Sequence, residues 1–219
     1  MRKVFILALA VICIVGLSAV SFAEITGSVH DLTVSTTGLG ITEICAVCHS
    51  PHDSGANRAS NGPLWNHEVS GVTFTLYSSD NPNAESNNVT DVSGSSRLCL
   101  GCHDGVTALD AYNGDPGTTP LATPGKIIPN LNGTTGDLSG THPISVVYNE
   151  DPAYQLNPIG GVTLGGVSPL ANVLVNTRVE CSTCHDVHNN TGPGGETQGA
   201  MLLRADPTGS ALCLACHNK

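Results

Sequence analysis

Cys45-Ala46-Val47-Cys48-His49 is the first of four stretches that share one frame, Cys-x-x-Cys-His. The same frame returns at Cys99–His103, Cys181–His185 and Cys213–His217, so the motif holds all but one of the 9 cysteines. Two thiols three positions apart can both add to the vinyl groups along one porphyrin edge, and the next residue then lies beneath the iron. The repeat therefore predicts four covalently attached c-type haems.

Each motif supplies two thioether sulfurs and one proximal iron ligand. The predicted thioether residues are Cys45, Cys48, Cys99, Cys102, Cys181, Cys184, Cys213 and Cys216. The predicted proximal ligands are His49, His103, His185 and His217. Cys13 lies outside the repeat, within the apolar run near the N-terminus, and is not expected to bind haem.

Three other uses of paired cysteines compete with haem attachment. Cys-x-x-Cys pairs hold structural zinc, but zinc does not require a histidine directly after every pair. A thioredoxin-like redox motif occurs once, between a strand and a helix, and not four times. Disulfides suit an exported protein but leave the four histidines unexplained. Haem attachment accounts for the whole motif.

The composition predicts a fold that is mostly irregular. Aromatic residues make up 4% of the chain, while 25 glycines and 13 prolines favour turns and loops. We therefore expect a loop-rich tetrahaem cytochrome c in which stacked porphyrins replace a side-chain core. Each Cys-x-x-Cys-His should lie on a helical turn, and the alternation at residues 71–77 predicts one small hairpin.

The N-terminus has the pattern of a secretory signal peptide. Arg2 and Lys3 precede an apolar run, and Ser21-Phe22-Ala23 has the spacing of a cleavage site. A retained membrane anchor is the alternative, because the run approaches the roughly 20 residues that span a bilayer. We expect cleavage after residue 23, no stable membrane insertion afterwards, and a tetrahaem domain at residues 24–219.

The mature chain is strongly acidic. Removal of residues 1–23 takes away two basic residues and no acidic one, so 6 basic residues face 18 acidic residues. Such a chain repels nucleic acid and anionic membrane surfaces. Cationic surfaces, divalent metal ions and further copies of the chain are more plausible partners.

Five histidines outside the motifs can serve as distal iron ligands: His30, His52, His67, His142 and His188. They outnumber the four vacant positions, and Met201 is the one methionine left after cleavage, so bis-histidine ligation is expected at every haem. We assign His30, His52, His142 and His188 as distal ligands. His67 is the histidine left over, although it is an alternative distal ligand.

Two motifs carry a further histidine three residues on, as Cys-His-x-x-His. His52 follows His49 in this way, and His188 follows His185. The second histidine cannot bind the iron that the first already holds, but it can reach the iron of a neighbouring haem. The other two motifs match each other as Leu-Cys-Leu-x-Cys-His, so the chain divides into two diverged dihaem modules, about 24–150 and 151–219.

The sequence resembles bacterial multihaem cytochromes with doubled Cys-x-x-Cys-His motifs. Within that group it is similar to the small tetrahaem cytochromes that polymerise into extracellular electron-conducting filaments. The matching segments are scattered over the mature chain, at residues 27–32, 45–52, 62–67, 74–77, 98–106, 142–145, 179–189 and 212–219. The resemblance implies stacked bis-histidine haems and a ligand histidine that crosses between subunits.

Electron transfer is the function that these features predict, and no enzymatic activity is expected. His30 lies seven residues into the mature chain, and it could bind a haem of the next subunit in a head-to-tail homopolymer. The alternatives are a monomeric periplasmic shuttle and, with less support, a multihaem reductase, which needs one iron with an open face. We expect an exported protein, extracellular or at the cell surface and otherwise periplasmic, that exchanges electrons with partner cytochromes and external acceptors.

Overall fold

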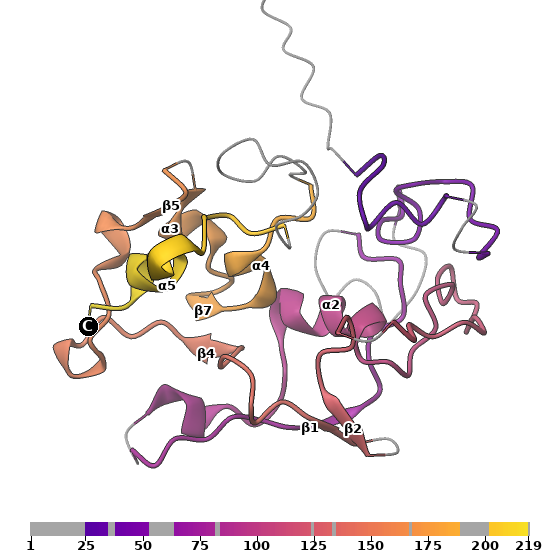
Figure 1. The fold of residues 1–219 in the computed structure, drawn as a ribbon. Helices are drawn as coiled ribbons and strands as arrows, with labels where there is room; N and C mark the ends of the chain where they lie inside the picture. Colours follow the sequence, from indigo (N-terminus) through magenta and orange to yellow (C-terminus); the bar gives the residue numbers. More distant parts are fainter. Residues whose placement is uncertain are drawn as a thin grey trace, which may run out of the picture.

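Short helices and very short strands alternate with long irregular stretches (Figure 1). The computed structural model describes residues 25–34, 38–52, 64–81, 84–123, 125–132, 135–166, 168–188 and 202–218. The α-helices are α2 (Gly94–His103), α3 (Leu170–Val173), α4 (Cys181–Cys184) and α5 (Ala211–Cys216). The 3-10 helices are η2 (Glu85–Asn88), η3 (Pro152–Tyr154), η4 (Ile159–Gly161) and η5 (Thr208–Ser210).

All four Cys-x-x-Cys-His motifs lie on helical turns, as predicted. Three of them lie on α2, α4 and α5. In the first motif the backbone N–H of His49 donates to the Cys45 carbonyl at 2.8 Å, which is the hydrogen bond of a single helical turn. Helical spacing places the two thiols of each motif on one side of the turn.

In the described part of the chain, three small sheets join the loops. The largest contains β1 (Thr73–Thr75), β2 (Asn130–Asn132) and β3 (Thr135–Asp137), in the order β1-β3-β2. The other two pair β4 (Val146–Val147) with β7 (Arg178–Val179), and β5 (Thr163–Leu164) with β6 (Ser168–Pro169), both antiparallel.

The strand expected within residues 71–77 is present as β1, but the hairpin expected there is wrong. β1 pairs in parallel with β3, some sixty residues later in the chain, and the antiparallel neighbour of β3 is β2. The alternating pattern predicts the extended backbone of β1, whereas its partner depends on long-range packing that a local pattern does not encode.

Among the described residues, buried apolar side chains form two small clusters. One joins Tyr148, Val162, Leu164, Leu170 and Ala205, and further residues of α3 and α5 pack against it. The other joins Val92, Leu100 and Leu138 against α2. Few large apolar side chains take part in either cluster.

The two halves of the chain pack against each other through these helices. α2 from the first half contacts α4 from the second, and β4 pairs with β7 (Figure 1). The dihaem modules at 24–150 and 151–219 stay a prediction about sequence ancestry, because these contacts cross the boundary between them. The signal peptide at 1–23 and Met201 lie outside the described residues.

Within the described ranges, no helix combines the length and the apolar character that a bilayer crossing requires.

Candidate haem-ligand site

Three motif histidines each lie opposite a histidine from elsewhere in the chain. The ring centroids of His49 and His188 are 6.0 Å apart. Those of His103 and His30 are also 6.0 Å apart. Those of His217 and His142 are 6.3 Å apart. Each pair joins one predicted proximal ligand to one predicted distal ligand.

This spacing is the one that a shared iron requires. An imidazole nitrogen lies about 2 Å from a metal that it binds, and the ring centroid lies about 1 Å further back, so two axial imidazoles have centroids about 6 Å apart. Distance alone is not specific, because Trp65 also lies 6.3 Å from His49. The specific observation is that three pairs have this spacing and that each has the predicted composition.

The pair of His49 with His188 connects the two Cys-His-x-x-His motifs. His188 belongs to the third motif, yet its ring lies opposite the histidine of the first. This is the crossed arrangement that the spacing predicts for neighbouring haems. His52 is exposed at the end of segment 38–52, and its role as a distal ligand of a neighbouring haem stays a prediction.

Backbone carbonyls fix the orientation of several of these rings. Nδ1 of His103 lies 2.7 Å from the Lys126 carbonyl oxygen, and Nδ1 of His142 lies 2.9 Å from that of Pro143. A carbonyl oxygen can only accept, so Nδ1 carries the proton and Nε2 keeps its lone pair. Metal-binding histidines in proteins typically have this arrangement.

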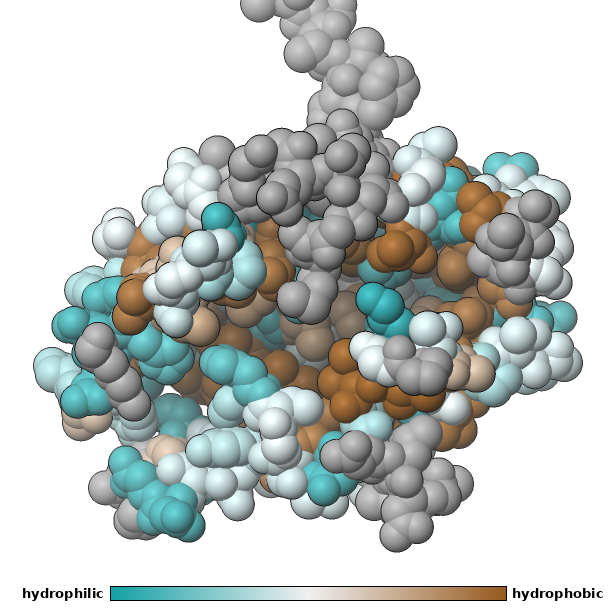
Figure 2. All heavy atoms as spheres, in the orientation of Figure 1, coloured by the Kyte–Doolittle hydropathy of each residue, from teal (hydrophilic) through white to brown (hydrophobic). Residues whose placement is uncertain are grey.

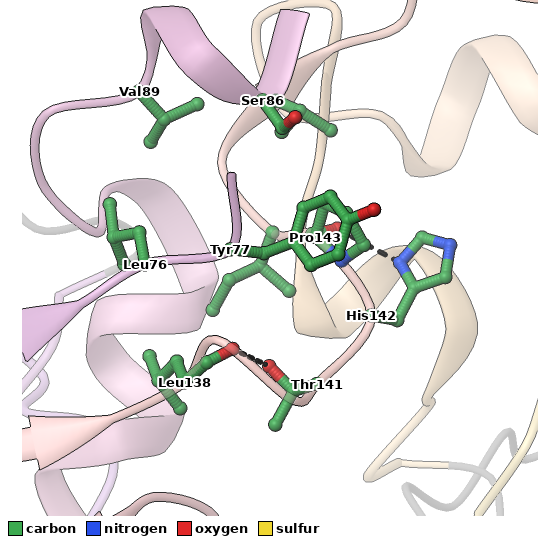
Figure 3. A pocket seen from close by; sticks show the side chains of 10 residues that line it. Leu76, Tyr77, Ser86, Val89, Leu138, Thr141, His142 and Pro143 are labelled. Atoms are coloured by element: carbon green, nitrogen blue, oxygen red, sulfur yellow. Dashed lines mark hydrogen bonds between the residues drawn. The ribbon is translucent and has the colours of Figure 1, made fainter. Parts of the chain in front are cut away.

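The ring of His142 lies at the edge of a small apolar pocket (Figure 3). Tyr77, Leu138 and Pro143 line that pocket, and Nδ1 of His142 faces the Pro143 carbonyl while Nε2 points away from the pocket. The segment that follows β3 is therefore packed by its apolar residues, and the reactive nitrogen remains outside. This packing leaves Nε2 available to a metal.

His30 is held neutral by its surroundings. Burial lowers its pKa to about 4, and electrostatic repulsion from Lys126 and from the protonated forms of His103, His185 and His188 acts in the same direction. Its Nδ1 is buried and has no hydrogen-bond partner among the described residues. A neutral imidazole with an unused nitrogen can bind a metal ion, so the ring is chemically competent as a ligand.

His67 is 1% exposed and lies beside the second motif. Its Nδ1 is 2.8 Å from the Glu68 carbonyl oxygen, and its Nε2 is 3.4 Å from the Sγ atom of Cys102. The sequence assigns this histidine as the one left over. It shares with His103 and His142 the contact of Nδ1 with a backbone carbonyl oxygen.

The motif cysteines are free thiols, which is the form that reacts with the haem vinyl groups. None of the eight described cysteines forms a disulfide. Burial raises the pKa of the Cys48 and Cys184 thiols to about 11 and that of Cys102 to about 12. Each Sγ atom here represents a free thiol, and in a haem-loaded chain it would be a thioether sulfur.

The second and third motifs meet at the junction of α2 and α4. The Cys99 thiol donates a hydrogen bond to Cys181, which raises the pKa of Cys99 and lowers that of Cys181. The hydroxyl groups of Ser95 and Ser182 form a further hydrogen bond between α2 and α4, with their oxygens 2.6 Å apart. Haems on these two motifs would therefore be attached at adjacent sulfurs.

Two buried carboxylates hold this region, and the sequence analysis did not single out either of them. Glu180 is 1% exposed and accepts from the hydroxyls of Ser93 and Ser145, both at 3.1 Å. Asp104 is fully buried and accepts from the hydroxyls of Ser70 at 2.6 Å and Thr107 at 2.7 Å. A signal was present for Asp104, because an aspartate directly follows the motif histidine here and again at Asp186.

The fourth motif is held by a segment that the sequence analysis also overlooked. The side-chain amide of Asn157 donates to the carbonyls of Leu214 at 3.1 Å and Ala215 at 3.0 Å, and its backbone N–H donates to Cys216 at 2.8 Å. The Tyr148 hydroxyl donates to the Asn157 carbonyl at 2.7 Å. These bonds satisfy carbonyls that the last turn of α5 leaves without helical partners.

Apolar surface accompanies the motifs. In Figure 2, brown apolar residues gather across the middle of the face shown, and hydrophilic residues form much of its rim. Leu214 lies inside the fourth motif and is 48% exposed, and Ile128, which is also exposed, donates its backbone N–H to the His103 carbonyl. Exposed apolar side chains at these positions suit contact with a flat apolar group.

The donor set fits haem c. Paired thiols on helical turns, imidazoles in opposed pairs and exposed apolar side chains beside them are the three features that such a group requires. Among the described residues, no three His, Cys, Asp or Glu side chains converge as a cage for a bare metal ion. A haem iron takes two axial ligands from the protein, which is the number that each opposed pair supplies.

The chain matches no protein-family model and no curated protein.

Proposed function

We propose that this chain binds four haems covalently and transfers electrons, as a subunit of an extracellular electron-conducting filament. The observation that carries the proposal is the set of three opposed histidine pairs, with ring centroids 6.0 to 6.3 Å apart. When bound, haem iron supplies a one-electron Fe(III)/Fe(II) couple. At these three motifs two imidazoles would hold the iron and leave no face open for a substrate, which favours a carrier over an enzyme.

The protein supplies orientation, neutrality and proximity. Carbonyls of Lys126 and Pro143 fix the rings of His103 and His142, so that Nε2 keeps its lone pair. Burial keeps His30 neutral. The contact of Cys99 with Cys181 and the crossed pair of His49 with His188 each join two different motifs. Short distances between motifs are what rapid electron transfer along one chain needs.

Stoichiometry and ligation provide the first test. Mass spectrometry under denaturing conditions should show the mature chain carrying four haems, and three or fewer would refute the assignment of all four motifs. Replacing His142 or His188 by alanine should convert one haem from low spin to high spin, because one axial ligand is lost. If neither variant changes the spectrum, the distal assignments are wrong.

A monomeric periplasmic shuttle is the second candidate. The position of His30 favours it, because the ring lies opposite His103 of its own chain, and no second copy is needed to complete that pair. The filament is supported instead by the resemblance of the sequence and by the N-terminal position of His30.

Assembly distinguishes the two candidates. Electron microscopy of the secreted wild-type protein, with and without divalent cations, should show polymers, since cations offset repulsion between acidic subunits. A protein that stays monomeric at high concentration would support the shuttle. Filaments that persist in the His30→Ala variant would exclude His30 as the ligand that joins subunits.

A further inference from the structure

Within the described chain, the same backbone pairing occurs at the first, third and fourth haem-binding motifs. At each of them a three-residue segment from elsewhere in the chain pairs antiparallel with the motif histidine through its middle residue. The first residue of each segment is not glycine and has a positive φ of 51° to 54°. We call these the pairing segments, and they are residues 64–66 at the first motif, 202–204 at the third and 155–157 at the fourth.

The hydrogen bonds of the three pairing segments are equivalent. The last residue of each donates its backbone N–H to the carbonyl of the second motif cysteine, at 3.0 Å for Asn66 and 2.8 Å for both Arg204 and Asn157. The side chain of that residue donates to the carbonyl of the residue that follows the first motif cysteine. The pairing segments therefore fix the backbone of three proximal histidines in the same way.

The middle residue is where the pairing segments differ in chemistry. Leu203 lies opposite the motif histidine at the third motif and Leu156 at the fourth, whereas Trp65 has this position at the first. A leucine is therefore sufficient for the pairing. Tryptophan adds a larger ring and one polar group, the indole N–H.

The indole N–H of Trp65 has no acceptor among the described residues. Its Nε1 atom is buried and makes no hydrogen bond. The ring lies edge-on to that of His49, with centroids 6.3 Å apart and planes inclined by 86°. A buried donor without an acceptor costs free energy, and buried N–H groups in proteins almost always have one. The position of Trp65 beside the predicted proximal ligand of the first haem indicates that the acceptor belongs to a group that binds there.

We propose that the indole N–H of Trp65 donates a hydrogen bond to a propionate of the haem attached at Cys45 and Cys48. This inference rests on the proposed haem attachment and deepens it. The pyrrole nitrogens of a haem bind its iron, so the two carboxylates are the strong hydrogen-bond acceptors that remain. Leucine at the equivalent position cannot donate, so this bond distinguishes the first haem from those at the third and fourth motifs.

The consequence is a change in the reduction potential of one haem. The negative charge of a propionate stabilises Fe(III) over Fe(II), and a hydrogen bond from the indole offsets part of that charge. Hydrogen bonding around a haem is one of the means by which a protein sets its potential. Trp65 should therefore raise the potential of the first haem, whereas a plain packing role gives no such effect.

Ultraviolet resonance Raman spectroscopy of the haem-loaded wild type tests the bond directly. Trp65 is the one tryptophan of the chain, so the indole bands come from a single residue. The band that responds to N–H hydrogen bonding should have the frequency of a bonded indole, calibrated with indole in an alkane and in solvents that accept hydrogen bonds. A frequency equal to that in the alkane would overturn the proposal, and this measurement needs no variant.

Two variants, Trp65→Phe and Trp65→Leu, identify the acceptor. Phenylalanine keeps an aromatic ring and leucine reproduces the other pairing segments, but neither has an N–H. Redox titration followed by electron paramagnetic resonance should show that both variants lower the potential of one haem. That haem is the one whose low-spin signal is lost in His188→Ala, because His188 lies opposite His49. Leu203→Val is the matched control, since it changes the middle residue of another pairing segment without removing a donor.

Other outcomes overturn the proposal in recognisable ways. A bonded indole in the wild type, with unchanged potentials in both variants, would assign the acceptor to the protein. A shift in Trp65→Leu but not in Trp65→Phe would assign the effect to the aromatic ring. Equal shifts at all haems, or a similar shift in Leu203→Val, would indicate a general change in packing. A wild type that lacks four covalent haems would instead refute the proposed function itself.

Discussion

α2 and α5 carry nearly the same motif, Leu-Cys-Leu-x-Cys-His, in very different surroundings. In α2, Leu98 and Leu100 are 7% and 1% exposed, and the helix has ten residues with neighbours on both sides. In α5, which has six residues near the C-terminus, the equivalent of Leu100 is Leu214, which is 48% exposed. The repeated motif therefore determines the local turn, whereas the rest of the fold determines how well each turn is covered.

The two helices are also anchored by different means. α2 is packed by Val92 and Leu138 and joined to α4 by serine hydroxyls. α5 depends on the side chain of Asn157 and the hydroxyl of Tyr148, which cap its last carbonyls. Apolar burial stabilises α2, whereas polar capping stabilises α5. Different substitutions should therefore destabilise the two helices.

The leucine between the cysteines gives the largest expected contrast. Leu100→Ala removes a fully buried side chain and should lower the free energy of unfolding by about 2–5 kcal/mol. Leu214→Ala removes one that is half exposed and should cost less than about 1 kcal/mol. Denaturant unfolding of the haem-loaded proteins, followed by circular dichroism, measures both. An equal loss for the two would mean that Leu214 is covered in the assembled protein.

The residue that follows this leucine is Gly101 in α2 and Ala215 in α5, and exchanging the two should give a smaller difference in stability. Gly101→Ala places a Cβ atom 2.5 Å from the Glu68 carbonyl oxygen, and relief of that overlap should cost about 1–3 kcal/mol. The reciprocal change, Ala215→Gly, costs only backbone entropy, up to about 1 kcal/mol. Denaturant unfolding measures both changes in stability. If Gly101→Ala leaves the free energy of unfolding unchanged, the Glu68 carbonyl can move away from the added Cβ atom.

Removal of the polar cap should affect α5 alone. Asn157→Leu keeps the volume but removes two side-chain hydrogen bonds, each contributing about 0.5–1.5 kcal/mol net. The haem on the fourth motif should then bind carbon monoxide more readily, since His217 lies at the freed end of α5. Asn149→Leu is the matched control, because its side chain bonds Glu85 at 2.7 Å instead of α5. Equal effects of both changes would contradict a local cap.

These contrasts mark the limit of what the motif predicts. Helical turns at all four motifs and the strand at Thr73–Thr75 follow from local spacing and alternation, and both are present. The parallel partner of that strand was not predictable, because it lies about sixty residues away. Proximal histidines follow directly from covalent geometry. Distal partners depend on how distant segments fold together, which is why the sequence leaves His67 as an alternative distal ligand.

The supporting residues were missed for a related reason. Glu180, Asn157 and Tyr148 belong to common residue types and to no repeated motif, so their roles come only from the carbonyls and hydroxyls that the fold brings to them. Asp104 and Asp186 were recognisable in principle, since both follow a motif histidine. They differ in burial, because Asp104 is enclosed by hydroxyls while Asp186 pairs with Arg204 at 2.8 Å.

The smallest expected effect is spectroscopic, and it refines the comparison without altering stability. The two imidazole planes of the α5 pair, His142 and His217, are inclined by 67°, and those of the α2 pair, His30 and His103, by 57°. The pair of His49 and His188 is inclined by only 25°. Each imidazole π system interacts with one dπ orbital of ferric iron, so nearly parallel rings separate these orbitals strongly and steeply crossed rings leave them close in energy.

Electron paramagnetic resonance of the oxidised protein should therefore show a rhombic low-spin signal from the near-parallel pair and more anisotropic signals with larger maximal g values from the crossed pairs. The assignment is checked by substitution. His142→Ala should remove one of the most anisotropic signals, whereas His188→Ala should remove the rhombic one, because each variant takes one ligand from a different pair. If His142→Ala removes the rhombic signal instead, the orientation of the α5 pair in the haem-loaded protein differs from the one described, and the contrast between the motif helices does not extend to their ligands.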